Sequence, residues 1–260
     1  MRTVAIIQAR MGSTRFPGKV LSDLHGASLL QWLLERVKAA PSVDRIVVAT
    51  GEGAENKAIT DWVSDLNDPD IHTFVGSEHD VLERFYFAAR AHDADVIVRL
   101  TADDPLKDPQ IIEEALAKLR SDGGYDYCSN TVETSYPEGL DVETFTFKAL
   151  ERAFEMASLP SEREHVTPFI WKQPDQFNSR RFHFEQDLSH WRWTIDTAYD
   201  LQVMEKVLAK YSGARLTGYR ELIAHVENTP ELLALMQHRI TERNEGYKIS
   251  LDREKDKLSD

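Results

Sequence analysis

Residues 4–21 read VAIIQARMGSTRFPGKVL, a short apolar run followed at once by a loop rich in glycine, hydroxyl and cationic residues. The apolar run predicts a buried strand, and in an open α/β sheet ligands bind beyond the carboxyl ends of the strands. Glycines in such a loop let the backbone approach a ligand, and the free N–H groups form a nest for an anion. The cations of the loop, Arg10, Arg15 and Lys19, favour a polyphosphate over a single carboxylate.

The loop matches neither of the common phosphate-binding motifs. Gly18-Lys19 is followed by Val20 instead of Ser or Thr, and the glycine spacing is not G-x-G-x-x-G. The alternative interpretation is a basic surface loop with a turn at Pro17-Gly18. The position of the loop directly after a buried N-terminal strand favours the phosphate-binding interpretation.

The first half of the chain alternates strand and helix patterns. Apolar runs of strand length recur at Ile46–Ala49, Ile71–Val75 and Val96–Leu100, with helical periodicity between them. A further helix is predicted after Asp108, a suitable N-cap, with Pro109 at its first position. This alternation predicts an α/β fold with a mostly parallel sheet and helices on both faces.

The second half is less regular. Strands are expected at Glu143–Phe147, Arg180–Phe184 and Arg192–Ile195, and helices over residues 197–210, 219–227 and 229–237. We therefore expect a single α/β domain over residues 1–249 with a C-terminal helical extension. Residues 250–260 carry seven charges without an apolar pattern, which predicts a solvated charged tail.

Composition limits the class of protein. The formal net charge of −13 argues against nucleic acid as a partner, because binding to a phosphate backbone needs a basic face. Cys128 is the single cysteine, so an intramolecular disulfide and a cysteine-rich metal site are excluded. Since no stretch approaches the ~20 apolar residues of a membrane span, we expect a cytoplasmic protein without membrane insertion.

Carboxylates follow two of the expected strands. Asp103 and Asp104 come directly after Val96–Leu100, where a ligand of the first loop would also lie, and they suit Mg²⁺. The alternative is simple turn chemistry in Asp-Asp-Pro. Asp196 follows the expected strand 192–195 and is either a second metal ligand or a favourable charge at a helix N-terminus. Thr197 and Asp200 can cap that helix themselves, which leaves Asp196 free for another role.

Further polar residues lie between these two acidic positions. Asp141 and Glu143 would point to the same side if both belong to a strand. Glu164 has a structural interpretation, because Ser161-x-x-Glu164 has the pattern of a capping box. His165 is either a site residue or a buried structural histidine.

Several spaced motifs resemble one enzyme family, the cytidylyltransferases that activate acidic sugars, such as the synthetases of CMP-Kdo and CMP-sialic acid. Within that family the chain looks most similar to the spore coat polysaccharide biosynthesis protein F group. The resembling motifs span most of the chain: Gln8–Leu21, Gly76-Ser77-Glu78-x-x-Val81-Leu82-x-Arg84, Arg99-Leu100-Thr101-x-Asp103, Glu138-Gly139-Leu140-Asp141-Val142-Glu143, Arg163-Glu164-His165-Val166-Thr167, Thr194-x-Asp196-Thr197 and Asn244-Glu245-Gly246-Tyr247.

The resemblance implies a Rossmann-like nucleotidyltransferase fold, usually in a homodimer. It also implies Mg²⁺-dependent transfer of CMP from CTP to a hydroxyl of a sugar acid or a related sugar or polyol, with release of pyrophosphate. Asp103 and Asp196 would be the metal ligands, and with Arg10, Arg15 and Lys19 they would form the catalytic set. The nucleotide-binding residues would be Ala9, Arg10, Met11, Gly12, Ser13, Arg15, Lys19, Arg84 and Thr101. The candidates for binding the acceptor are Asp141, Glu143, Arg163 and His165.

Two positions depart from the better-known synthetases. Ala102 precedes Asp103 where the family usually has glycine, and Gln8 replaces the proline of the CMP-Kdo and CMP-sialic acid enzymes. The second departure fits the spore coat group. The acceptor itself stays open.

Two other functions compete with this one. Asp103-Asp104 superficially resembles the acidic motif of metal-dependent glycosyltransferases that use nucleotide sugars, although the cationic loop suits a triphosphate better. A non-catalytic nucleotide-binding protein would be expected to lose Lys19, Asp103 or Asp196. The aromatic side chains between residues 136 and 193 either form a patch for a partner subunit or fill the core. These side chains are Phe145, Phe147, Phe169, Trp171, Trp191 and Trp193.

Overall fold

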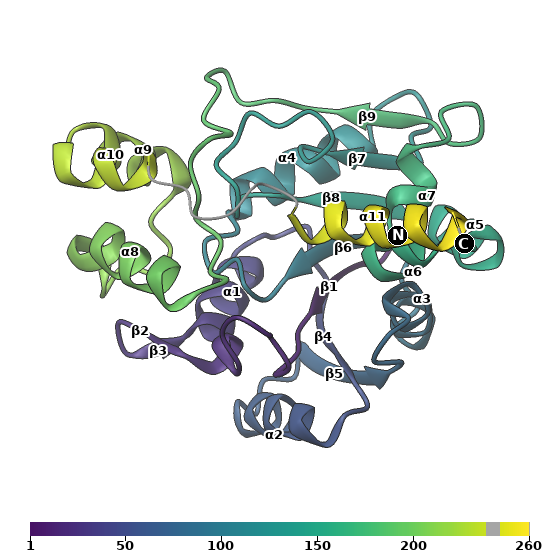
Figure 1. Cartoon of the computed structure of the whole chain (residues 1–260), viewed down its shortest axis with the longest axis horizontal. Helices are drawn as coiled ribbons and strands as arrows, with labels where there is room; N and C mark the ends of the chain where they lie inside the picture. Colours follow the sequence, from purple (N-terminus) through teal and green to yellow (C-terminus); the bar gives the residue numbers. More distant parts are fainter. Residues whose placement is uncertain (238–244, 260) are drawn as a thin grey trace.

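A seven-stranded sheet forms the centre of the molecule (Figure 1), in the order β5-β4-β1-β6-β8-β7-β9. The computed structural model describes residues 1–237 and 245–259. Strand β1 (Thr3–Gln8) pairs in parallel with β4 (Arg45–Gly51) and β6 (Val96–Thr101), and β4 pairs in parallel with β5 (Ile71–Gly76). These are the four strands predicted in the first half of the chain.

The other part of the sheet is mixed. Strand β8 (Glu143–Thr146) runs antiparallel to β6 and to β7 (Tyr127–Ser129), and β7 pairs in parallel with the short strand β9 (Ser179–Arg181). The strand predicted at residues 143–147 is present but ends one residue earlier than predicted. The strand predicted at residues 180–184 is present as the shorter strand β9. Strand β7 was missed.

The strand expected at Arg192–Ile195 is wrong. This segment forms one isolated bridge, between Arg192 and Glu138, and otherwise runs as an extended loop. Its alternating pattern has a different cause, because Trp191, Trp193 and Ile195 are buried in the core while Arg192 and Thr194 line a cavity. The alternation therefore comes from a loop whose side chains are buried on both sides, although its backbone forms no continuous ladder of hydrogen bonds.

Helices cover both faces of the sheet, as predicted. Because successive side chains of a strand point to opposite faces, Ala5 and Ile7 of β1 belong to one apolar cluster and Val4 and Ile6 to the other. The first cluster includes residues of α1 (Leu29–Lys38), α2 (Lys57–Asp65), α4 (Pro109–Leu119), α8 (Ala198–Leu208), α9 (Tyr219–Glu227) and α10 (Pro230–Gln237), and the second those of α3 (Val81–Ala91), α5 (Phe147–Met156) and α7 (Pro168–Trp171). A small hairpin of β2 (Asp23–Leu24) and β3 (Ala27–Ser28) lies beside α1.

The helix ends test three sequence predictions. Asp108 caps α4 by accepting a hydrogen bond from the Gln110 N–H, and Thr197 and Asp200 form the expected capping box of α8. The capping box predicted for Ser161 and Glu164 is wrong. Helix α6 (Pro160–His165) begins two residues earlier than that box requires, because proline suits the first helical position.

The C-terminal segment differs from the expected solvated tail. Helix α11 (Glu245–Ser259) runs through the predicted boundary at residue 250 and packs against α6 (Figure 1). Ser250 and Glu254 are buried there, and the Glu254 carboxylate accepts a hydrogen bond from the Ser161 N–H. Polar groups make this contact, so the charged sequence gave no apolar signal for it. Asn244 of the resembling motif lies outside the described residues.

Four of the six aromatic side chains expected either at a subunit interface or in the core belong to the core. Phe145, Phe169, Trp191 and Trp193 are buried within the chain. Phe147 and Trp171 are partly buried and pack against the second apolar cluster. Within residues 1–237 and 245–259, no helix is long and apolar enough to cross a membrane.

Candidate active site

The loop after β1 is fixed by its own backbone. Gly18 has a φ of 72°, a left-handed conformation that favours glycine, and its N–H donates to the Met11 carbonyl at 2.9 Å. The Met11 N–H in turn donates to Asn56 Oδ1 at 2.9 Å. The closed loop leads Lys19 into a buried position at the end of the sheet.

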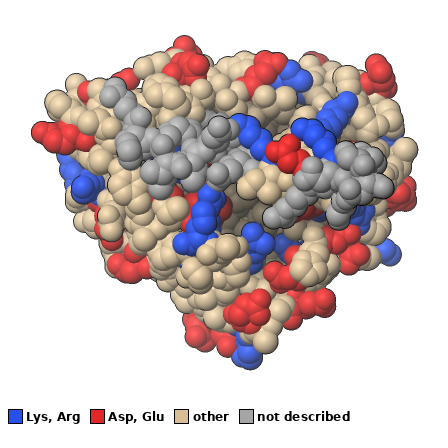
Figure 2. Space-filling view, viewed as in Figure 1, with Lys and Arg blue, Asp and Glu red and all other residues tan. Residues whose placement is uncertain are grey.

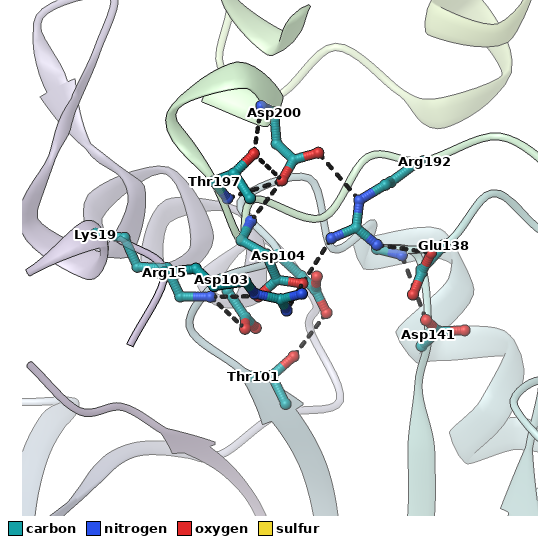
Figure 3. Close-up of polar contacts among 12 residues, drawn as sticks. Arg15, Lys19, Thr101, Asp103, Asp104, Glu138, Asp141, Arg192, Thr197 and Asp200 are labelled. Atoms are coloured by element: carbon teal, nitrogen blue, oxygen red, sulfur yellow. Dashed lines mark hydrogen bonds and ion pairs between the residues drawn. The ribbon is translucent and has the colours of Figure 1, made fainter. Parts of the chain in front are cut away.

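The ammonium of Lys19 joins the two carboxylates predicted as metal ligands (Figure 3). Its Nζ lies 2.9 Å from Asp103 Oδ2 and 2.7 Å from Asp196 Oδ1. Burial alone would raise the pKa of Asp103, but the nearby ammonium outweighs burial and lowers this pKa to about 2. Burial alone would likewise lower the pKa of Lys19, and the two carboxylates raise it. Lys19 and Asp103 are therefore both charged at neutral pH.

Asp196 is also held from its other side. Its Oδ2 lies 3.2 Å from Arg15 and 2.6 Å from Arg192. Arg192 continues to Asp200 at 3.0 Å and to Glu138 at 3.1 Å, so one guanidinium joins three acidic residues. Burial would lower the pKa of Arg192, but these carboxylates raise it. The network fixes the loop before α8 and directs Asp196 toward Lys19.

Asp103 and Asp104 divide the two roles proposed for the pair. The buried Asp104 accepts a hydrogen bond from the Thr101 hydroxyl at 2.6 Å and pairs with Lys107 at 2.7 Å. Lys107 also donates to the Asp141 carbonyl. Burial raises the pKa of Asp104. Asp104 thus stabilises the turn, whereas Asp103 pairs with Lys19 of the first loop.

Gly139 fixes the loop that faces Arg192. Its φ is 106°, and a Cβ atom on it would lie 2.7 Å from the Trp193 carbonyl carbon. The flanking Glu138 accepts a backbone hydrogen bond from Trp193 at 2.7 Å and donates one to Trp191 at 3.0 Å. Only glycine therefore allows the two loops to approach this closely.

A cavity of about 660 Å³ lies beyond the carboxyl ends of β1 and β6. Figure 2 shows Lys and Arg side chains at the rim of a hollow on this face. Of the residues predicted to bind nucleotide or metal, the cavity is lined by Ala9, Arg10, Ser13, Arg15, Lys19, Arg84, Thr101, Asp103 and Asp196. Met11 and Gly12 were predicted to bind nucleotide but are not lining residues, and Met11 instead anchors the loop.

A second cavity of about 470 Å³ adjoins the first. Of the predicted acceptor residues, Asp141, Glu143 and His165 line it. Arg163 does not; its guanidinium is 2.5 Å from Asp80 Oδ2 at the start of α3 and donates to the Phe154 carbonyl at 2.8 Å. The structure therefore assigns Arg163 a contact between α6 and its neighbouring helices.

Glu143 forms part of a buried network at the edge of the second cavity. Its Oε1 accepts hydrogen bonds from the hydroxyls of Tyr127 and Thr167, both at 2.6 Å, and its Oε2 pairs with Arg99. Burial raises the pKa of Tyr127, and the carboxylate raises it further. Glu143 consequently holds β6, β7 and the start of α7 together.

The second cavity contains functional candidates that the sequence reasoning missed. Trp171 and Tyr247 line it with their rings 5.9 Å apart, and Arg99, Lys107 and Arg192 line it as cations with carboxylate partners. Tyr247 and Arg99 stood in resembling motifs and could have been selected. Lys107, Trp171 and Arg192 gave no such signal, because their proximity depends on loop packing.

His165 lines both cavities. Its Nε2 lies 3.0 Å from Ser250 Oγ of α11, and the Ser250 hydroxyl donates to Glu164 at 2.7 Å. Burial lowers the pKa of His165 to about 4, so the imidazole is neutral at pH 7. The hydrogen bond to Ser250 couples the C-terminal helix to the site.

The donor set suits a divalent ion held by few protein ligands. Among the described residues, no group of three or more His, Cys, Asp or Glu side chains could hold a metal. Asp103 and Asp196 nevertheless converge on one cation, the ammonium of Lys19, and both line the cavity. Mg²⁺ is usually held by one or two carboxylates together with substrate phosphates and water, so this pair fits it.

The sheet order, the cationic loop and the carboxylate pair define a Rossmann-like nucleotidyltransferase fold. A family model described as Cytidylyltransferase matches residues 4–240, and the chain belongs to this family. A solved cytidylyltransferase from Leptospira borgpetersenii superposes with a TM-score of 0.85 and 30% identity, over 94% of this chain and 100% of that one.

Two relatives match along most of their length. An uncharacterised protein of Methanocaldococcus jannaschii is 36% identical over 234 residues, 89% of this chain and 93% of the relative. The spore coat polysaccharide biosynthesis protein SpsF of Bacillus subtilis is 31% identical over 239 residues, 87% of this chain and 94% of the relative. The predicted family and fold are thus confirmed.

Proposed function

We propose that the protein transfers CMP from CTP to a hydroxyl of a sugar acid or a related sugar or polyol, releasing pyrophosphate. The main support for this proposal is the pair of adjoining cavities, which share Arg10, Arg15, Thr101, Asp103, His165 and Asp196. A donor nucleotide in the first cavity and an acceptor in the second would meet at these residues. The relative SpsF, named for polysaccharide biosynthesis, supports a role in making a surface glycan.

The reaction is an in-line displacement at the α-phosphorus. The acceptor oxygen forms a bond to phosphorus while the bond from phosphorus to the oxygen shared with the β-phosphate breaks, and pyrophosphate leaves. Arg10, Arg15 and Lys19 neutralise the triphosphate and steady the departing charge. Most of the rate enhancement then comes from positioning and charge stabilisation.

Asp103 and Asp196 are the residues that would hold Mg²⁺. When bound, the ion supplies charge neutralisation for the phosphates. Arg192 orients Asp196, and the backbone N–H of Ile195 donates to the Asp103 carbonyl at 2.9 Å, which keeps the two carboxylate loops together. Preorganisation of both carboxylates is therefore a property of the fold.

The second cavity suits a polyhydroxylated acceptor. Its carboxylates, including Asp141, can accept hydrogen bonds from hydroxyls, and the rings of Trp171 and Tyr247 can cover an apolar sugar face. We also propose that the protein is a homodimer and that it works in the cytoplasm, where nucleoside triphosphates are made. Light scattering that gives a monomer mass at micromolar concentration would contradict the dimer.

The test is pyrophosphate release from each of CTP, ATP, GTP and UTP, with a panel of sugar acids and sugar alcohols. We expect release with CTP, dependent on one class of acceptor and on Mg²⁺. A CMP-linked product, identified by mass spectrometry, completes the assignment. Activity with a nucleotide sugar but none with CTP would contradict the proposal and support a glycosyltransferase.

A further inference from the structure

The junction of the two cavities needs a group that accepts the proton of the acceptor hydroxyl. Six of the described residues line both cavities, and they include two arginines, a threonine and two carboxylates that already hold the Lys19 ammonium. The sixth, His165, is a neutral base. Its position is therefore the one where a proton acceptor can reach the attacking oxygen.

The hydrogen bonds of His165 determine which nitrogen is free. The Ser250 hydroxyl has one proton, and it donates this proton to the Glu164 carboxylate at 2.7 Å. Ser250 Oγ can then only accept from His165 Nε2, 3.0 Å away, so Nε2 carries the ring proton. Nδ1 is consequently the unprotonated nitrogen of a ring that lines both cavities.

The ring is also held in place. Tyr247 of α11 contacts it edge-on, with ring centroids 5.2 Å apart. Glu254 of the same helix accepts from the backbone of Ser161 in α6, which anchors α11 on the helix that carries His165. Helix α11 thus supplies the hydroxyl that fixes the tautomer and an aromatic side chain that packs on the ring.

We propose that His165 is the general base of the transfer, and that Ser250 and Glu164 are positioning residues that keep its Nδ1 unprotonated and open to the acceptor. This inference rests on the proposed function. As the oxygen–phosphorus bond forms, the hydroxyl proton moves to Nδ1 and pyrophosphate leaves from the opposite side of phosphorus. The imidazolium is then stabilised by Glu164, whose Oε2 lies 3.9 Å from Nε2, and it loses its proton to solvent afterwards.

The first experiment measures the tautomer in the full chain and needs no substrate. Nitrogen-15 NMR of histidine-labelled protein at pH 7, with His165→Gln to assign the signal, is expected to give a protonated Nε2 for His165. In Ser250→Ala the signal should shift toward a mixture of tautomers, whereas the control Asp252→Asn, an exposed position on α11, should leave it unchanged. A protonated Nδ1 in the wild type would overturn the proposal.

The second experiment measures catalysis. With CTP and the acceptor among 3-deoxy-manno-octulosonate, N-acetylneuraminate and ribitol that releases pyrophosphate, His165→Gln should lower kcat by ~10²–10⁴-fold. The Kd for CTP should stay within about threefold of the wild type, since the variant keeps the charge of the nucleotide cavity. Ser250→Ala should cause a smaller loss in kcat, and Asp252→Asn none.

The two proposals fail in different ways. A wild type that releases no pyrophosphate from CTP contradicts the proposed function, while the NMR result still tests the tautomer. A wild type that turns over together with a His165→Gln variant of near-normal kcat overturns the general base. A His165→Gln variant that loses CTP affinity in proportion to its activity also overturns it, because His165 would then bind the nucleotide.

Discussion

The two cavities of the site are built in different ways. The nucleotide cavity takes much of its lining from one continuous stretch, residues 8–20, placed at the end of β1. The acceptor cavity draws on segments far apart in the chain, from Arg10 to Tyr247, and its cations Arg99, Lys107 and Arg192 are all paired with carboxylates. The proposed phosphate site is thus encoded locally, whereas the proposed acceptor site depends on tertiary structure.

The largest loss of activity is expected for substitutions of Asp103 and Asp196, which lie where the two cavities meet. Asp103→Asn and Asp196→Asn each remove one charge without changing the shape of the side chain, and each should lower kcat by at least ~10²–10³-fold. Circular dichroism should be unchanged, because Lys19 keeps its second carboxylate partner. Removing Mg²⁺ with EDTA should abolish pyrophosphate release from the wild type, and adding it back should restore it.

Near-normal turnover in both variants would show that these carboxylates are structural partners of Lys19 and Arg192. The metal would then have to be held elsewhere. Asp104→Asn is the matched comparison, since Asp104 lies next to Asp103 but is paired with Lys107. It should lower stability more than it lowers activity.

The next-largest loss of activity is expected for substitutions of Lys19, which lines the nucleotide cavity. Lys19→Met keeps the apolar stem but removes the charge that joins Asp103 and Asp196, and kcat should fall by ~10²–10³-fold with a rise in the KM for CTP. Lys19→Arg should recover only part of the activity, because a planar guanidinium does not replace a compact ammonium. Unchanged kcat and KM in Lys19→Met would exclude a role for this residue in phosphate chemistry.

Lys19→Met should also change the pKa of the Asp103 carboxyl. Without the ammonium, the Asp103 and Asp196 carboxylates repel each other, so the pKa of Asp103 should rise from about 2. In the wild type the low folded-state pKa of Asp103 contributes stability above its unfolded pKa of about 3.8, which is lost as the pH falls toward 2. Lys19→Met should lose this contribution, and carbon-13 NMR of the Asp103 carboxyl measures the shift directly.

The contrast between the cavities also explains what the sequence could predict. The first four parallel strands, the cationic loop and Asp103 follow from local patterns, because a strand end and the loop after it are continuous in sequence. Asp196 was selected as the residue after a strand that the structure does not contain, and the resembling motif Thr194-x-Asp196-Thr197 was the sounder signal for it. Arg192 could not be assigned, since its role depends on the carboxylate of the distant Glu138 as well as on Asp196 and Asp200 at the start of α8. The pattern at residues 191–195 misled for a related reason. In an extended loop that is buried on both sides, apolar and polar residues alternate with the same two-residue period as in a strand.

The C-terminal segment was misjudged because its contacts are polar. Ser250 and Glu254 lie one helical turn apart on the side of α11 that meets α6, and each makes a hydrogen bond instead of an apolar contact. A hydrophobic pattern cannot reveal such docking. The resembling motif at Tyr247 was the available signal, but it did not reveal the ring contact with His165.

An intermediate effect is expected for Gly139→Ala, which disturbs the loops of Glu138 and Arg192, two residues that line the second cavity and not the first. The new methyl group would meet the backbone of Trp193 at a positive φ, so the variant should lose ~1–3 kcal/mol of stability. Movement of the Glu138 and Arg192 loops should raise the KM for the acceptor, while the Kd for CTP should change little. Thermal unfolding and isothermal titration with CTP measure the two quantities.

Gly213→Ala is the control for that variant, because a Cβ atom there meets no atom within 4 Å and φ lies outside the left-handed region. Its stability should be close to that of the wild type. If Gly139→Ala weakened CTP binding as much as acceptor binding, the two cavities would be mechanically coupled and the comparison between them would fail.

The smallest effect is expected for Arg163, which the sequence suggested as an acceptor ligand and the structure places between helices. Arg163→Met breaks the ion pair with Asp80 but keeps an apolar stem near Phe154, so it should cost ~0.5–1 kcal/mol of stability and leave the KM for the acceptor unchanged. Asp80→Asn is the matched variant, because asparagine still caps α3 while the ion pair is lost. Urea unfolding of both single variants and the double variant should give a coupling free energy for the ion pair alone, since both substitutions remove it. Arg163→Met also loses the hydrogen bond to the Phe154 carbonyl, so its own loss of stability should exceed this coupling. A rise in the acceptor KM without a loss of stability in Arg163→Met would instead mean that this guanidinium reaches the acceptor, and the boundary drawn here for the second cavity would be wrong.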